Sequence, residues 1–207
     1  MFSEAGAPVT GRRRGRGVDT ADRLLSAAEG LFAESGYSSV SPGDVAYAAG
    51  IGRTTFYEHF TDLEDLLAAL VEARMPQVTD QLVAAIPQAE TPTRQLTEFV
   101  VRMVEFAVTD PVLGVSLHQG LPALGPETQA RIAAAHHSIG VEFGRIYRAG
   151  VEAGELRAMP GDLVGRFLQD LVMAAARTLI DLEAPEQRLV EVTDDLVRFL
   201  FHGLSAV

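Results

Sequence analysis

Residues 45–60 of the chain read VAYAAGIGRTTFYEHF, two short helix-forming segments with a glycine turn between them. Gly50 suits that turn, because glycine adopts a positive φ at little steric cost. The apolar contacts that would hold the two helices at a fixed angle come from Val45, Ile51, Phe56 and Phe60. In a helix-turn-helix, the second helix enters the DNA major groove and its N-terminal residues meet base edges. The pattern therefore predicts a DNA-reading motif over about residues 41–60.

Helix signals continue on both sides of this motif. Asp19 is a plausible N-cap for a helix that Gly36 ends, and Ser41 with Pro42 marks the start of the first motif helix. A longer helix is expected over about residues 62–86. We find no period-2 alternation and no Asn-Gly or Asp-Gly hairpin signal, so the predicted fold class is all-α.

Proline and glycine divide the remainder of the chain into about five further helices. We expect residues 76–207 to form a helical bundle for ligand binding and dimerisation. Its last two helices, over about 161–182 and 185–204, are apolar over wide faces, and we expect them to pair across a two-fold axis. The interface residues expected there are Phe167, Leu171, Leu196 and Phe199.

The charge is unevenly distributed along the chain. All 17 basic residues are arginine, and the net charge is -11. Residues 1–60 carry six arginines against seven acidic residues, so most of the negative charge lies in residues 61–207. The N-terminal part can therefore face DNA even though the whole chain is acidic. Residues 1–17 are expected to form a flexible basic arm whose DNA-contacting residues are Arg12, Arg13, Arg14 and Arg16.

The run FAESGYSSVSPGDVAYAAGIGRTTFYEHFTDLEDLLAAL resembles the DNA-binding region of the TetR family of transcriptional regulators. The resemblance covers residues 18–75, which we take as the DNA-binding domain, and AGIGRTTFYEHF is its most specific part. Family members commonly carry a lysine where this chain has Leu63. The resemblance implies phosphate contacts by Ser41, Tyr57 and His59. It places Arg53, Thr54 and Thr55 at base edges or adjacent phosphates. Gly52, which the second motif helix also presents outward, is a further DNA-binding candidate.

The resemblance also implies a homodimer on a near-palindromic double-stranded operator, and a small-molecule effector. We expect a repressor that a largely hydrophobic effector releases from DNA. Residues with helical spacing on apolar faces are candidates for the effector site: Met103, Phe106, His118, Gln119, Phe143, Tyr147 and Met173.

No metal or cofactor is expected. The chain has no cysteine, which excludes disulfides and thiolate chemistry. The side chains of His136 and His137 point about 100° apart on a helix and so cannot share an ion. None of the residues four positions away from this pair is a ligand type: Ile132, Ala133, Gly140 and Val141.

Two other classes of function stay open at this stage. A ligand-independent architectural DNA binder would use the same arm and helix with little sequence preference. An enzyme would need clustered polar residues in the C-terminal domain, but the HExxH, GxSxG, P-loop and GxGxxG patterns are all absent. No secretory signal or apolar membrane span appears, so a cytoplasmic protein without a membrane partner is expected.

Overall fold

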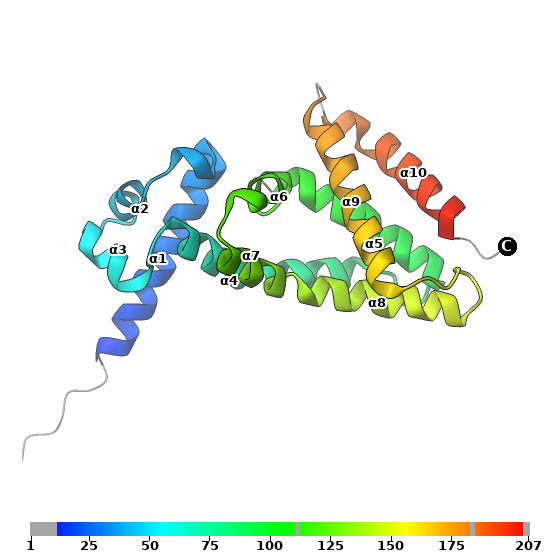
Figure 1. The fold of residues 1–207 in the computed structure, drawn as a ribbon, viewed down its shortest axis with the longest axis horizontal. Coiled ribbons are helices and arrows are strands. Elements are labelled where there is room, and N and C mark those ends of the chain that lie inside the picture. Colours follow the sequence, from blue (N-terminus) through cyan, green and yellow to red (C-terminus); the bar gives the residue numbers. More distant parts are fainter. Residues whose placement is uncertain (1–11, 111, 183–184, 205–207) are drawn as a thin grey trace, which may run out of the picture. The chain divides into compact units, whose positions relative to one another are not determined.

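The computed structural model describes residues 12–110, 112–182 and 185–204 (Figure 1). The chain divides into two compact units, residues 1–69 and 70–207. The described residues form helices and contain no β-strand, which confirms the all-α class. None of the described helices is both long enough and apolar enough to cross a membrane.

From residue 12 onward, where the structure describes it, the first unit contains three helices and the beginning of a fourth. These are α1 (Arg12–Ser35), α2 (Pro42–Ala48), α3 (Arg53–His59) and α4 (Leu63–Ala85), with a single 3₁₀ turn η1 (Tyr37–Ser39) after α1. Helix α2 packs on both α1 and α3. The buried core of this unit includes Leu24, Ala28, Phe32, Val45, Ala46, Phe56, Phe60 and Leu66.

The helix ends of the first unit follow from local chemistry. Gly36 adopts φ 76° directly after α1, and its amide donates to the Phe32 carbonyl at 3.0 Å. Ser41 and Asp44 form a reciprocal capping box at the start of α2. The Asp44 amide donates to the Ser41 hydroxyl oxygen at 3.3 Å, and the Ser41 amide donates to the Asp44 carboxylate at 2.9 Å. Gly50 adopts φ 65° between α2 and α3.

The start of α1 differs from the expectation. Helix α1 begins at Arg12, so Asp19 lies inside the helix and is not its N-cap. The first turns of α1 therefore include the four arginines that were expected in an arm: Arg12, Arg13, Arg14 and Arg16. Arginine has a high helix propensity, and adding residues to an existing helix is easier than starting one, so α1 extends through Gly15 and Gly17. Residues 1–11 and the side chains of residues 12–18 lie outside the described part.

The second unit contains the rest of α4 and six further helices in the described residues. These are α5 (Pro92–Thr109), α6 (Val115–Gly120), α7 (Pro126–Ala135), α8 (His137–Glu152), α9 (Gly161–Ile180) and α10 (Pro185–Leu204), with a 3₁₀ turn η2 (Leu121–Ala123) after α6. Helices α8, α9 and α10 all pack on α5 (Figure 1). One helix more than expected is found because the chain breaks at His136, between α7 and α8.

The loop from α8 to α9 is held by several specific contacts. Gly154 takes φ 72° at the end of α8, and the next residue, Glu155, accepts a hydrogen bond from the Thr93 amide at the start of α5 (2.9 Å). The Tyr147 hydroxyl donates to the Arg157 carbonyl at 2.6 Å and accepts from the Met159 amide at 2.9 Å. These contacts fix the loop against α5 and α8.

The capping box should contribute measurably to stability. We expect Ser41→Ala to lower the free energy of unfolding by about 1 kcal/mol, because the first amides of α2 lose their side-chain acceptor. Ser38→Ala is the matched control, since Ser38 is exposed in η1. Urea denaturation followed by circular dichroism measures both variants. Equal stabilities of the two variants would contradict a role for the cap.

Candidate functional site

Helix α3 presents two distinct faces. Phe56 is fully buried and Phe60, directly after the helix, is almost so, and both rings pack in the small core of the motif. Arg53, Thr54 and Tyr57 are exposed, while Thr55 and His59 are half-buried. Gly52 precedes the helix in an extended conformation and is also exposed. The residues expected to read DNA thus lie on one short helix with its apolar face covered.

Arg53 and Tyr57 form a pair on the exposed face of α3. The Arg53 Nη2 atom donates to the Tyr57 hydroxyl at 3.4 Å, and the guanidinium carbon lies 5.9 Å from the centre of the ring. The hydrogen bond with Tyr57 raises the pKa of Arg53 above its usual value, so the group is always charged. The ring limits the orientations of the guanidinium, which suits a bidentate contact with a base or phosphate.

Arg23 holds the turn of the motif, a role that the sequence analysis missed. This residue lies on α1, and its Nη2 atom donates to the Ala49 carbonyl at the C-terminal end of α2. A cation at that end satisfies a free carbonyl and interacts favourably with the helix dipole. The contact joins the first helix to the turn that orients α3. A single arginine in an amphipathic helix gives no sequence signal for such a role.

The structure does not favour the phosphate contact expected for Ser41. The Ser41 hydroxyl donates its only proton to the Asp44 carboxylate at 2.6 Å, and its amide donates to the same oxygen. These hydrogen bonds hold the pKa of Asp44 below its usual value, so Asp44 stays negative beside the helix start. A phosphate there would meet an anion, so the geometry assigns Ser41 to capping.

Tyr47 is a second residue that the sequence analysis did not single out. Val45 and Ala46 bury one face of α2, whereas Tyr47 is 88% exposed on another. The first helix of such a motif crosses the DNA backbone. An exposed phenol there has a hydroxyl available to a phosphate, and we add it to the candidate DNA contacts.

The second unit contains a cavity of about 700 Å³. This volume lies within the range of small-molecule pockets. Helices α5, α6, α8 and α9 supply most of its walls. Six of the seven expected effector-site residues line it: Met103, Phe106, His118, Phe143, Tyr147 and Met173. The seventh, Gln119, is exposed and is not among the lining residues, because it lies one residue beyond His118 on α6 and points another way.

The cavity walls are mainly apolar and aromatic. The ring of Phe143 lies centrally, 6.3 Å from that of Phe99 and stacked 6.0 Å from that of Tyr147. Gly140 and Gly144, one turn apart on α8, and Gly165 on α9 also line the space. A Cβ atom added at Gly140 would meet no atom within 4 Å, and at the other two none closer than 3.9 Å. Missing side chains therefore create part of the cavity.

Polar groups lie at opposite parts of the cavity. Arg148 and Arg166 line it together with Asp162 and Gln169, where α8 ends and α9 begins. His118 and His136 line it elsewhere, with ring centres 5.9 Å apart. His136 could not be recognised as a cavity residue from the sequence, because its partner is His118 of α6 and not its neighbour His137. Among the described residues, no group of three or more potential metal ligands occurs.

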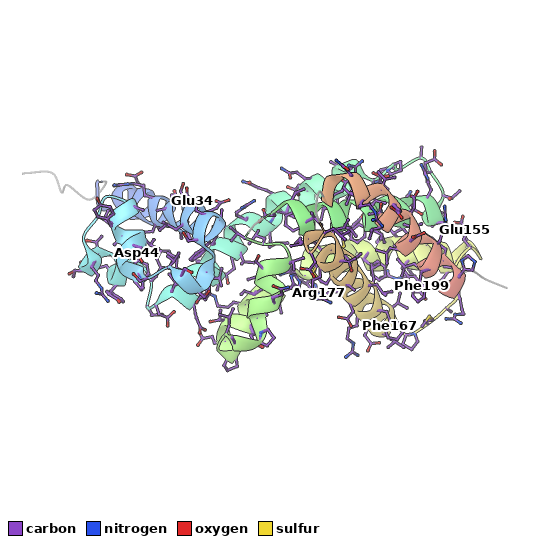
Figure 2. The ribbon with its side chains drawn as sticks, turned by 90° about the horizontal axis from the view of Figure 1, so that it is seen from above. Glu34, Asp44, Glu155, Phe167, Arg177 and Phe199 are labelled. Atoms are coloured by element: carbon purple, nitrogen blue, oxygen red, sulfur yellow. The ribbon has the colours of Figure 1, made fainter. Side chains whose placement is uncertain are left out.

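An apolar face on α9 and α10 adjoins the cavity, because the hollow beside this face shares Phe143, Met159 and Leu168 with the cavity walls. Phe167 and Phe199, labelled in Figure 2, are 51% and 68% exposed, and Leu171 between them is half-buried. All three line a shared hollow. Leu196 is different: it is only 8% exposed, since it lies with Leu200 on the side of α10 that packs on α5 and α9. The structure thus removes Leu196 from the expected interface.

Comparison with known proteins follows the same division of the chain. Residues 24–70 match the family described as bacterial regulatory proteins, tetR family. Residues 89–177 match the family described as tetracyclin repressor-like, C-terminal domain. The two matches together cover the helix-turn-helix and most of the walls of the cavity.

Among individual proteins, an uncharacterised HTH-type transcriptional regulator of Mycobacterium tuberculosis is 28% identical over 54% of this chain and 55% of its own length. The HTH-type transcriptional repressor BepR of Brucella suis is 31% identical over 48% of each chain. The chain therefore spans about half the length of these relatives. The structure of FadR from Bacillus subtilis in complex with stearoyl-CoA has a TM-score of 0.71 over 88% of this chain and 98% of that one, at 20% identity, a likeness of fold.

The exposed face of α3 makes a direct prediction. If Arg53 contacts a guanine, Arg53→Ala should weaken binding to a preferred DNA site by about 1–3 kcal/mol and relax the preference at one base position. Arg94→Ala removes the same charge from the exposed surface of α5 and is the control. Fluorescence anisotropy with sites selected from a random DNA pool measures both. Unchanged affinity and preference in Arg53→Ala would remove Arg53 from the reading face.

Proposed function

The chain belongs to the TetR family of DNA-binding transcriptional regulators, and we propose that it is a repressor that a small, largely hydrophobic molecule releases from its operator. One observation carries this proposal: the unit that follows the reading helix contains a mainly apolar cavity of about 700 Å³. Such a cavity suits a ligand sensor, whereas an architectural DNA binder has no use for it. BepR, matched over about half its length, is named a repressor.

On the DNA side, we propose that α3 enters the major groove of each half of a near-palindromic operator. Arg53, Thr54 and Thr55 would meet base edges or adjacent phosphates, and Gly52 would allow close approach of the backbone. Tyr47, Tyr57 and His59 would contact phosphates. The helical segment with Arg12, Arg13, Arg14 and Arg16 would add positive charge near the DNA.

Signalling between the cavity and the DNA requires a physical link, and α4 is the element that spans both units. Within the second unit, three contacts join α4 to the segments around the cavity. Arg131 of α7 makes two hydrogen bonds to Glu72 at 2.9 and 2.8 Å. Asp110, after α5, pairs with Arg74 at 2.8 Å, and Ser138 of α8 bonds to Thr79 at 2.9 Å.

These contacts allow a ligand to act on α4. A molecule that displaces α7 or α8 would move Glu72 and Thr79 with them, and α4 continues into residues 63–69 of the DNA-binding unit. Release follows if the ligand and the operator favour different positions of α4. A tenfold loss of DNA affinity needs a coupling free energy of about 1.4 kcal/mol, which is within the usual allosteric range.

The glycines on α8 offer a test of the cavity as the effector site. We expect Gly144→Leu to fill the cavity, preserve operator binding and abolish release by a compound found to release the wild-type protein. Gly144→Ala should bind operator normally with a smaller loss of response, because its methyl group occupies little space. Both variants should be more stable than wild type by about 0.5–1 kcal/mol, as glycine is unfavourable inside a helix.

The matched control is Ala134→Leu, which enlarges an exposed residue of α7 that lines neither the cavity nor the hollow beside the α9–α10 face. Anisotropy with labelled operator, titrated with hydrophobic compounds, measures release for all four proteins. Release of Gly144→Leu at the wild-type concentration would place the effector elsewhere. If no compound releases the wild-type protein, a ligand-independent DNA binder becomes the better description.

We further propose that the α9–α10 face forms the homodimer. Exposed aromatic residues on neighbouring helices are unusual on a monomer, and a four-helix interface would cover Phe167, Leu171 and Phe199. Two reading helices would then address half-sites with centres about 34 Å, or a small multiple of that, apart.

The dimer is tested by charge at an exposed position. Phe199→Arg should give monomers in sedimentation experiments, because it places a cation in an apolar interface. Its side chain is 68% exposed within the chain, so the fold should persist. Val141→Arg is the control, since Val141 on α8 is 56% exposed outside this face. Phe199→Arg remaining dimeric would place the interface on another surface.

A further inference from the structure

His118 and His136 form an imidazole pair in the wall of the cavity. His118 lies in the last turn of α6, and His136 is the residue between α7 and α8. Their ring centres are 5.9 Å apart and the rings are close to perpendicular. Both side chains line the cavity. One small polar group of a bound molecule can therefore approach both rings.

The hydrogen bonds of each ring fix where its proton lies. The Nδ1 atom of His118 is 3.3 Å from the Gly114 carbonyl oxygen, and that of His136 is 2.7 Å from the Ile132 carbonyl oxygen. A carbonyl oxygen can only accept, so each Nδ1 carries the proton and donates it. In a neutral imidazole the other nitrogen, Nε2, is then a hydrogen-bond acceptor.

Both rings are neutral near neutral pH. Burial is the main cause that lowers the pKa of each histidine below its usual value. The neighbouring His136 and the positive charge of Arg177, labelled in Figure 2, lower the pKa of His118 further. The pair thus offers two Nε2 acceptors to the cavity and no second donor.

The Nε2 atoms of both histidines have no hydrogen-bond partner in the described part of the chain. In residues 12–110, 112–182 and 185–204, no hydrogen-bond donor is found for either atom. In the same residues, every fully buried side-chain nitrogen or oxygen has a hydrogen-bond partner. Because the two Nε2 atoms have none, they are not fully buried, and a molecule within the cavity can reach them. The hydroxyl of Tyr147, which also lines the cavity, already makes two hydrogen bonds to the α8–α9 loop.

The rest of the cavity separates this pair from the charged lining residues. Arg148 is 12 positions after His136 along α8, which corresponds to about 18 Å at the helical rise of 1.5 Å per residue. The stretch between them is lined by Ile139, Phe143, Tyr147 and two glycines. A ligand bound at the histidines therefore meets apolar walls over most of its length.

We propose that the His118–His136 pair selects neutral ligands with a hydroxyl donor, a phenol or an alcohol, and binds that hydroxyl through Nε2. This inference rests on the proposed sensor function and names its ligand class. A carboxylate would be repelled, because its negative oxygens would face the lone pairs of two Nε2 acceptors. An ammonium group would lose its hydration beside the positive Arg177. A hydroxyl needs no charge, and it satisfies an acceptor that an apolar ligand would leave buried and unpaired.

The experiment compares three probes with the same hydrocarbon chain. These are 4-octylphenol, its methyl ether 4-octylanisole, and 4-octylbenzoate, each titrated into the full chain by calorimetry. We expect the phenol to bind at least tenfold more tightly than the ether or the benzoate, because a site built to bond a hydroxyl rejects analogues that lack it. The double variant His118→Phe/His136→Phe should bind phenol and ether equally.

A second measurement does not depend on the folding of a variant. Nitrogen-15 NMR of the wild-type histidines should show protonated Nδ1 and unprotonated Nε2 on both rings, with the Nε2 signal shifting when 4-octylphenol binds. Protonated Nε2 on either ring would overturn the proposal. Equal binding of phenol and ether to the wild-type protein would overturn it while leaving the cavity as a sensor of hydrophobic molecules. Tightest binding of the benzoate would show that the arginines, not the histidines, select the ligand.

Discussion

The DNA-reading unit depends on a turn of a few residues whose backbone must reverse between α2 and α3. Gly50 takes φ 65° there, and Arg23 of α1 holds the Ala49 carbonyl that ends α2. A side chain at position 50 would be strained by the backbone and would lie 3.3 Å from the Arg23 guanidinium. Glycine and arginine together fix the angle of α3. Because of this angle, Phe56 is buried while Arg53 and Tyr57 remain exposed.

Much of this unit could be predicted, because its signals are local. Serine, proline and glycine at defined positions mark the ends of α2 and α3, and the structure agrees with them. The beginning of α1 could not be found in this way. Asp19 carries a capping side chain, but an established helix continues past such a residue when the preceding residues favour helix. A capping signal shows where a helix can begin, not where it must.

In the second unit, the helical spacing of apolar residues predicts the cavity walls better than it predicts the exposed face of α10. Helical periodicity identified most cavity residues, since residues such as Phe143 and Tyr147 repeat on one face of α8. It did not distinguish Leu196 from Phe199, because α10 is apolar over a wide arc and the packing of α5 and α9 decides which side is covered. The His118–His136 pair could not be predicted either, because His118 lies on α6 and His136 lies in the break between α7 and α8, and only the fold brings them together.

The glycines of α8 differ in what they permit over evolutionary time. Gly140 and Gly144 face open space, so an alanine, reached by a single nucleotide change, would reshape the binding volume and leave the scaffold intact. Gly150 on the same helix has no such freedom, since a Cβ there would lie 2.5 Å from Leu156. The residues that set which ligands fit and the residue that the fold requires are therefore at separate positions of one helix. Single substitutions at Gly140 or Gly144 can therefore change ligand specificity in small steps during evolution, without a compensating mutation that restores stability.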